Sequence, residues 1–176
     1  RALNYPYKKE NIMKVAIYPG SFDPITNGHI DILRRALRVF DKVIILVANN
    51  SSKQTVFTLE ERIEIINSII KDMNNVEVDS TDGLVVEYAK KVNAIALVRG
   101  LRAVSDFEYE LQLATTNEFI DPKIDMVFFM THLENTFISS STVKELFDQN
   151  VDISRLVPKQ VIKALENKRK QNNYKS

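Results

Sequence analysis

Residues 14–29 read KVAIYPGSFDPITNGH, and this stretch decides the fold of the chain. The apolar run from Lys14 to Tyr18 ends at Pro19-Gly20, which predicts a buried strand with a turn after it. Beyond the turn, apolar residues recur at helical spacing, and a helix is expected to start near Thr26 or Asn27. Strand, loop and helix in this order are the first half of a βαβ unit.

The same alternation continues along the chain. Thr58 and Glu61 have the spacing of a capping box at the start of one predicted helix. Thr142 and Glu145 have the same spacing at the start of another, over 142–147. Strands are predicted over 43–48, 76–78, 94–98 and 126–130, and further helices over 84–92, over 104–119 and from Pro158 onward.

Five strand–helix alternations predict a single doubly wound α/β domain around a five-stranded parallel sheet, a Rossmann-like fold. The domain is expected to span residues 13–168, between an N-terminal extension or cloning remnant at 1–12 and a flexible tail at 169–176. Ligands bind such sheets beyond the carboxyl ends of the strands, where the strand order reverses. The residues that follow each strand are therefore the functional candidates.

Composition excludes several classes of function. The 24 Lys and Arg residues nearly cancel the 23 Asp and Glu residues, so the net charge of +1 argues against nucleic acid or an anionic membrane as the partner. The chain has no cysteine, which excludes disulfides, thiolate nucleophiles and Cys-rich zinc sites. No apolar run is long enough for a membrane span and no signal peptide is visible, which favours a cytoplasmic location.

The loop after the first strand has the features of a phosphate site. Gly20 and Gly28 allow close approach of the backbone to a ligand or a positive φ. The following helix directs free N–H groups toward an anion, and His29 falls in its first turn. A plain turn and helix cap would explain the glycines and the histidine taken singly. The whole string, with its prolines, specifies a particular loop.

Three other strands are followed by phosphate-friendly residues. Lys53 lies in the polar loop after the second strand, Arg99 and Arg102 flank a glycine after the fourth, and hydroxyls at 139–142 follow the fifth. A solvated cation or an ordinary cap would explain each feature alone. Four such features at one edge of a sheet predict a nucleotide site, although neither Gly-x-Gly-x-x-Gly nor Gly-Lys-Ser/Thr occurs.

Four strings carry a family resemblance: YPGSFDP at 18–24, T-x-G-H at 26–29, RGLR at 99–102 and ISSS at 138–141. With FEYE at 107–110, they make the chain similar to the bacterial phosphopantetheine adenylyltransferases of the nucleotidylyltransferase superfamily. The similarity runs from about Met13 to Lys168. It implies reversible transfer of AMP from ATP to 4′-phosphopantetheine, giving dephospho-coenzyme A and pyrophosphate, with Mg²⁺ as cofactor and a homohexamer as the assembly.

The resemblance also implies roles for individual residues. His29 would stabilise the transition state, with Thr26 supporting the loop and Lys53 as the third catalytic residue. Ser21 and Lys53 would hold the phosphate of phosphopantetheine, with Val85 and Arg99 as further substrate contacts. Mg²⁺ would be held mainly through the nucleotide phosphates rather than by protein ligands. The ATP contacts would be Ser21, Phe22, His29, Gly100, Leu101, Arg102, Glu110, Asn135, Thr136, Phe137, Ile138, Ser139, Ser140 and Ser141.

This chemistry needs no general base. The attacking group is a phosphate, whose second pKa of about 6 makes it largely a dianion at pH 7. Two alternatives stay open at the level of sequence. Another transferase of the superfamily, acting on nicotinamide mononucleotide or glycerol phosphate, would share the T-x-G-H loop. A non-catalytic nucleotide sensor on the same fold would be expected to lack His29 or Lys53.

Overall fold

The computed structural model describes residues 13–49 and 54–173, and its centre is a five-stranded parallel sheet. The spatial order of the strands is β3-β2-β1-β4-β5, with every neighbouring pair parallel. The order reverses between β1 and β4, which creates the switch point where ligands bind in such folds. The predicted fold class is therefore confirmed. The strands are β1 (Val15–Gly20), β2 (Lys42–Ala48), β3 (Val76–Thr81), β4 (Ala96–Leu101) and β5 (Asp125–Met130).

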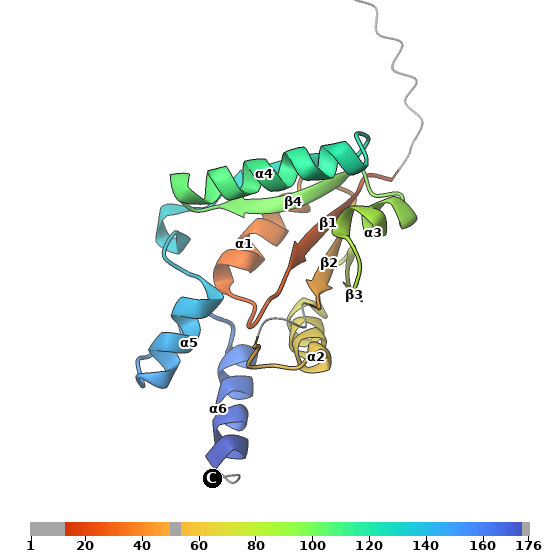
Figure 1. Cartoon of the computed structure of the whole chain (residues 1–176). Coiled ribbons are helices and arrows are strands. Elements are labelled where there is room, and N and C mark those ends of the chain that lie inside the picture. Colours follow the sequence, from red (N-terminus) through yellow and green to blue (C-terminus); the bar gives the residue numbers. More distant parts are fainter. Residues whose placement is uncertain (1–12, 50–53, 174–176) are drawn as a thin grey trace, which may run out of the picture.

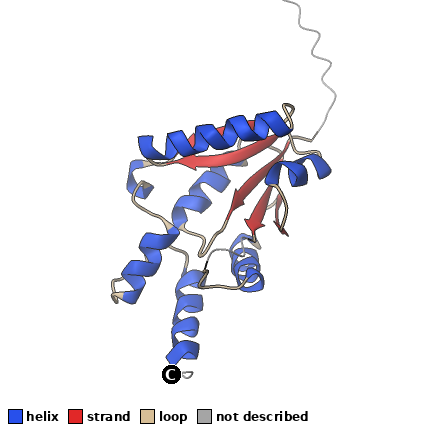
Figure 2. Cartoon of the chain, viewed as in Figure 1, coloured by secondary structure: helices blue, strands red, loops and turns tan. Residues whose placement is uncertain are grey.

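Helices cover both faces of the sheet (Figures 1 and 2). The larger apolar core lies between one face and helices α1, α2, α5 and α6. A smaller core lies under α3 on the other face, and α4 packs on β4 and β5. Helix α6 extends away from the sheet at the bottom of Figure 1. The helices are α1 (Asn27–Ala36), α2 (Leu59–Ile70), α3 (Val85–Lys91), α4 (Val104–Ile120), the 3₁₀ turn η1 (Leu133–Asn135), α5 (Ser140–Asp148) and α6 (Lys159–Asn173).

The central strands are buried on both sides because their side chains alternate between two cores. Ile17 and Leu46 pack in the smaller core, whereas Ala16 and Ile45 pack in the larger one. All four side chains are fully buried. This explains why β1 and β2 read as continuous apolar runs rather than as alternating strands.

The predicted bounds of three elements were wrong. Strand β3 continues to Thr81 instead of ending at residue 78. Helix α5 starts at Ser140, because the hydroxyl of Ser139, not that of Thr142, caps it by accepting a hydrogen bond from the backbone N–H of Thr142 (3.0 Å). Strand β4 continues to Leu101, because its pairing with β5 extends through the glycine and places Arg99 opposite Phe128. Helix α6 continues to Asn173, into the segment predicted as the C-terminal tail.

Nothing in the described part of the chain resembles a membrane span. No helix within residues 13–49 and 54–173 combines the length and the apolar character that crossing a bilayer requires.

Candidate functional site

A cavity of about 310 Å³ opens beyond the carboxyl ends of β1 and β4, at the switch point of the sheet. Its size lies at the lower end of the range of roughly 300–1,000 Å³ that small-molecule sites occupy. Residues from β1, α1, β4, α4 and the segment after β5 converge on it. The lining residues are Tyr18, Thr26, Gly28, His29, Ile32, Arg99, Gly100, Arg102, Asp106, Tyr109, Glu110, Thr131, Asn135 and Ile138.

His29 is held by the N-terminal cap of α1. Thr26 is the N-cap residue, and its Oγ1 accepts a hydrogen bond from the backbone N–H of His29 (3.3 Å). In return, Nδ1 of His29 accepts from the backbone N–H of Thr26 (3.0 Å). This is a capping box in which the imidazole takes the place of the usual Glu or Gln. Because Nδ1 is an acceptor, the neutral ring carries its hydrogen on Nε2, which remains as a donor for a ligand.

The charge state of His29 follows from its surroundings. Burial, and then the positive charges of Arg102 and Arg99, lower the pKa of His29 to about 4. The imidazole is therefore neutral at pH 7. It offers an N–H donor to an anion in the cavity, rather than a full positive charge.

Phe22 packs against the imidazole of His29. Its ring is buried and packs edge-on against the imidazole, with ring centroids 5.1 Å apart. A Cβ on Gly20 would lie 2.9 Å from Cζ of Phe22, so Gly20 is required for the approach of this ring. Of the two uses expected for the loop glycines, close approach or a positive φ, neither Gly20 nor Gly28 shows the positive φ; Phe22 takes a positive φ of 47° instead.

Gly28 serves a different purpose from Gly20. A Cβ built on Gly28 would come no closer than 3.6 Å to another protein atom, the Oγ1 of Thr26, so the protein tolerates a side chain there. Gly28 nevertheless lines the cavity. The missing side chain therefore leaves space for a ligand rather than for the protein.

We expect Gly28→Ala to fold normally and to bind ATP at least tenfold more weakly, because the added methyl group takes up space beside His29. The free energy of unfolding should stay within about 1 kcal/mol of wild type, since helix interiors favour alanine over glycine. Chemical denaturation and calorimetric titration with ATP measure the two effects. Wild-type affinity in this variant would show that the ligand does not approach the first turn of α1.

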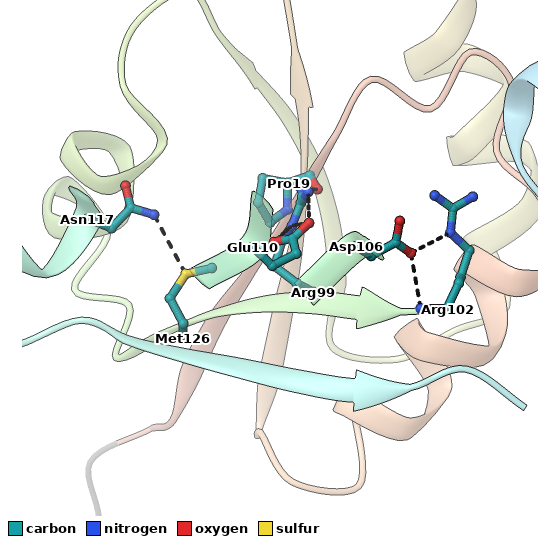
Figure 3. Close-up of polar contacts among 7 residues, drawn as sticks. All are labelled: Pro19, Arg99, Arg102, Asp106, Glu110, Asn117 and Met126. Carbon is teal, nitrogen blue, oxygen red and sulfur yellow. Dashed lines mark hydrogen bonds and ion pairs between the residues drawn. The ribbon is translucent and has the colours of Figure 1, made fainter. Parts of the chain in front are cut away.

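Arg99 and Glu110 form the main ion pair of the cavity (Figure 3). Nε of Arg99 lies 2.9 Å from Oε2 of Glu110, and Nη2 lies 2.5 Å from Oε1, which is a bidentate contact. Nη1 also donates to the backbone carbonyl of Pro19 (3.2 Å). Glu110 is buried, with a side chain only 7% exposed. The pair therefore fixes the guanidinium of Arg99 at the end of β1.

Arg102 lies at the more open side of the same cavity. Its Nε donates to Oδ2 of Asp106 (3.2 Å), and its backbone N–H donates to the same oxygen at the same distance. The side chain is 41% exposed. Arg102 thus offers a cation that is oriented by Asp106 on α4 (Figure 3) and exposed to solvent.

The segment after β5 reaches the cavity through only two of its predicted residues. Asn135 and Ile138 line it, whereas the three serines that follow do not. Ser139 caps α5, and Ser140 donates its hydroxyl to the carbonyl of Pro24 (2.8 Å). Two of the serines therefore make internal contacts, one of which ties α5 to the loop that precedes His29. Of the other predicted ATP contacts in this segment, Phe137 and Ser141 are exposed and Thr136 is half-buried.

Of the remaining predicted site residues that the structure describes, only some lie at the cavity. Gly100 lines the cavity, and Leu101 is buried beside it at the end of β4. Ser21 is exposed just beyond β1. Val85 does not line the cavity; it packs against the smaller core. Lys53 lies outside the described residues.

Five lining residues had no predicted role: Tyr18, Ile32, Asp106, Tyr109 and Thr131. Asp106 carried a detectable signal, because it follows Arg102 by four residues at the start of a predicted helix. Ile32 and Thr131 carried none. Their presence depends on α1 and the end of β5 meeting at the same edge of the sheet.

The described residues include no protein cage for a metal ion. Within 13–49 and 54–173, no group of three or more His, Asp or Glu side chains is arranged to hold one. A metal at this cavity would take most of its ligands from a bound polyphosphate and from water, as Mg²⁺ commonly does.

Known proteins resemble this chain in sequence and in fold. Residues 17–146 match the model of the cytidylyltransferase-like family. The phosphopantetheine adenylyltransferase of Lachnoclostridium phytofermentans is 50% identical over 156 residues, which is 89% of this chain and 96% of that protein. The enzyme of the same name from Caldanaerobacter subterraneus is 51% identical over 156 residues, covering 89% of this chain and 98% of that protein.

A solved structure extends the likeness of fold. The putative nicotinate-nucleotide adenylyltransferase from Vibrio parahaemolyticus superposes with a TM-score of 0.68 over 89% of this chain and 93% of its own. Its sequence identity is 20%, so it supports the architecture alone.

Proposed function

We infer the chemistry of this cavity from one premise: the chain belongs to the cytidylyltransferase-like family and, within it, to the phosphopantetheine adenylyltransferases. Its function is the reversible transfer of an adenylyl group from ATP to 4′-phosphopantetheine, which yields dephospho-coenzyme A and pyrophosphate. The observation that best connects this reaction to the site is the neutral His29, held by Thr26 with its Nε2–H free beside two arginines.

The reaction requires positioning and charge stabilisation more than acid–base catalysis. An oxygen of the phosphopantetheine phosphate forms a bond to the α-phosphorus of ATP, and the bond from that phosphorus to the bridging oxygen breaks as pyrophosphate leaves in line. The attacking phosphate is already a dianion at pH 7, so no residue has to remove a proton. Nε2–H of His29 donates to an α-phosphate oxygen as negative charge accumulates there.

The predicted binding residues divide between the two substrates. Ser21 and Lys53 bind the phosphate of phosphopantetheine, and Val85 and Arg99 contact the same substrate. Arg102 and Asn135 contact ATP, together with the other predicted residues of the nucleotide side. The ion pair of Arg99 with Glu110 supports this division, because it directs one guanidinium to the end of β1, next to the loop of Ser21.

Magnesium is the proposed cofactor. The residues present fit an ion carried by the nucleotide, because the described part of the chain has no acidic cluster to hold one itself. When bound, Mg²⁺ neutralises charge on the polyphosphate. The residues of the chain align the α-phosphate through His29 and the two arginines.

Assembly into a homohexamer is proposed from the family resemblance and from the surface of α4. This helix exposes large apolar side chains along its length, with Phe119 91% and Tyr109 64% exposed. Met130, at the end of the edge strand β5, is also 64% exposed. Several large exposed apolar side chains on one helix and the adjoining edge strand support a subunit interface at this surface. The proposed location of the enzyme is the cytoplasm.

Substrate pairing tests the function directly. Phosphopantetheine, nicotinamide mononucleotide and glycerol phosphate are each offered with ATP and with CTP, and release of pyrophosphate is followed. We expect the phosphopantetheine–ATP pair to have the highest kcat/KM, by at least a hundredfold. A preference for any other pair would assign the chain to a different specificity within the superfamily.

A further inference from the structure

Two buried charged side chains, Asp23 within the loop of residues 18–29 and Arg62 on α2, take no part in the chemistry above. Arg62 and Asp23 are each only 3% exposed, and neither lines the cavity. Burying a charge is costly unless it has specific partners. Apart from Lys144 of α5, the partners of these two side chains are in or next to the segments that follow β1 and β2.

Arg62 joins the ends of these two strands. Its Nη1 donates to the carbonyl of Ser21 (2.8 Å), just beyond β1, and to the carbonyl of Ala48 (3.2 Å), the last residue of β2. Its Nε donates to the carbonyl of Thr58 (3.3 Å), the N-cap of α2. No carboxylate in the described part of the chain lies within ion-pair distance of this guanidinium. Its hydrogen bonds within the described residues thus all go to backbone carbonyls.

Asp23 makes a second connection between the same segments. Its Oδ1 accepts from the backbone N–H of Phe57 (2.9 Å), and its Oδ2 accepts from that of Val56 (3.0 Å). Nζ of Lys144, on α5, completes the carboxylate at 3.0 Å. Asp23 therefore has a compensating cation, whereas Arg62 does not. The two side chains differ in charge balance although both hold the loop.

The absence of a close ion-pair partner for Arg62 bears on the binding of a phosphate ligand near Ser21. Ser21 is exposed beyond the sheet edge, and Arg62 contacts its carbonyl from the buried side. A guanidinium remains protonated even when buried, and in a medium of low dielectric constant it favours a nearby anion more strongly than a solvated cation would. Arg62 thus fixes the backbone of Ser21 and places behind it a positive charge that has no close ion-pair partner among the described residues.

We propose that Arg62 is a positioning residue for the phosphate of 4′-phosphopantetheine, acting through the Ser21 carbonyl and through its own charge. This inference rests on the proposed function of the site. It concerns phosphopantetheine rather than ATP, although Ser21 is also a predicted ATP contact, because Arg62 makes no hydrogen bond to a residue that lines the nucleotide cavity.

The test compares Arg62→Met with Arg62→Lys in the full-length protein. Methionine keeps much of the apolar stem but removes the charge and the hydrogen bonds, whereas lysine keeps the charge without the forked geometry. Calorimetry measures the binding of phosphopantetheine, of pantetheine without its phosphate, and of ATP. For Arg62→Met we expect phosphopantetheine to bind at least tenfold more weakly, with pantetheine and ATP within twofold of wild type. Arg62→Lys should recover part of the loss, in KM for phosphopantetheine more than in kcat.

Lys168→Met is the matched control. Lys168 also contacts the start of α2, through Glu61 (2.7 Å), but it reaches neither Ser21 nor Ala48. It should change phosphopantetheine binding less than twofold. If Arg62→Met does not fold, Arg62→Lys decides the question through the same three ligands.

Two results would overturn the inference. Equal weakening of all three ligands would mean that Arg62 only supports the fold, and wild-type affinity for phosphopantetheine would mean that it has no role in phosphate binding. Measurements on the wild-type protein distinguish failure of this inference about Arg62 from failure of the proposed function. If wild type neither binds nor turns over phosphopantetheine, the function is wrong; if wild type does both and the variants match it, only the role of Arg62 is wrong.

Discussion

Replacing His29 with alanine is expected to lower kcat about a thousandfold, the size of effect seen when one preorganised donor to a developing charge is lost. The Kd for ATP should stay within a few-fold of wild type, because the arginines and the α1 amides still contact the phosphates. The imidazole is neutral, since its pKa is lowered to about 4, and its value to the reaction is the Nε2–H that the Thr26 contact leaves free. Single-turnover kinetics and calorimetry measure the two quantities.

His29→Gln is the control for the role of the imidazole in the helix cap. Glutamine at this position can accept from the backbone N–H of Thr26, as in an ordinary capping box, and still present an N–H to the cavity. Activity between those of wild type and His29→Ala is expected, with the stability of wild type. If both variants turned over at the wild-type rate, His29 would be a helix cap and no more.

Replacing Arg99 with methionine is expected to destabilise the protein by about 3 kcal/mol and to abolish measurable turnover. The change leaves the buried carboxylate of Glu110 without its bidentate partner, and breaking one side of a buried pair typically costs roughly 3–5 kcal/mol. We expect a destabilisation at the lower end of this range, because the Arg99 side chain is 23% exposed. Denaturant unfolding monitored by circular dichroism gives the free energy of unfolding.

Two further variants separate stability from binding. Arg99→Met combined with Glu110→Leu removes both charges and should recover most of the lost stability without recovering activity. Arg102→Met disrupts the exposed pair with Asp106 and should change stability by less than about 1 kcal/mol. Its Kd for ATP should rise. A loss of stability in Arg99→Met no larger than that in Arg102→Met would contradict a structural role for the buried pair.

Local signals in the sequence predicted the features that depend on near neighbours. The apolar runs of β1 and β2, the capping box of Thr58 and Glu61, and the start of α1 at Thr26-Asn27 all appeared where they were expected. Each depends on side chains within one turn or one strand, which periodicity and capping patterns report directly. The position of His29 in the first turn of α1 could be predicted for the same reason, because His29 and its capping partner Thr26 lie three residues apart.

The sequence did not assign roles where several neighbouring residues were equally suited to the same role. Four consecutive hydroxyls at 139–142 each resembled an N-cap or an anion ligand, and only the packing of α5 assigned Ser139 to the cap and Ser140 to the Pro24 carbonyl. Strand β4 was predicted too short, because a glycine and two arginines suggest a loop until the partner strand is known. Pairing with β5 then extended the ladder to Leu101.

The sequence by itself determined the order of strands and helices, the parallel sheet, and a candidate phosphate loop with His29 in the first turn of its helix. Only the tertiary structure decided that Arg99 is oriented by Glu110, that Asp106, Tyr109 and Thr131 share the cavity, and that Arg62 and Asp23 are buried behind it. The physical reason is the range of the interactions. Periodicity and capping act within a turn or a strand, whereas Arg62 meets Ser21 across 41 residues of chain, and a charged residue reads the same in sequence whether it is solvated or buried.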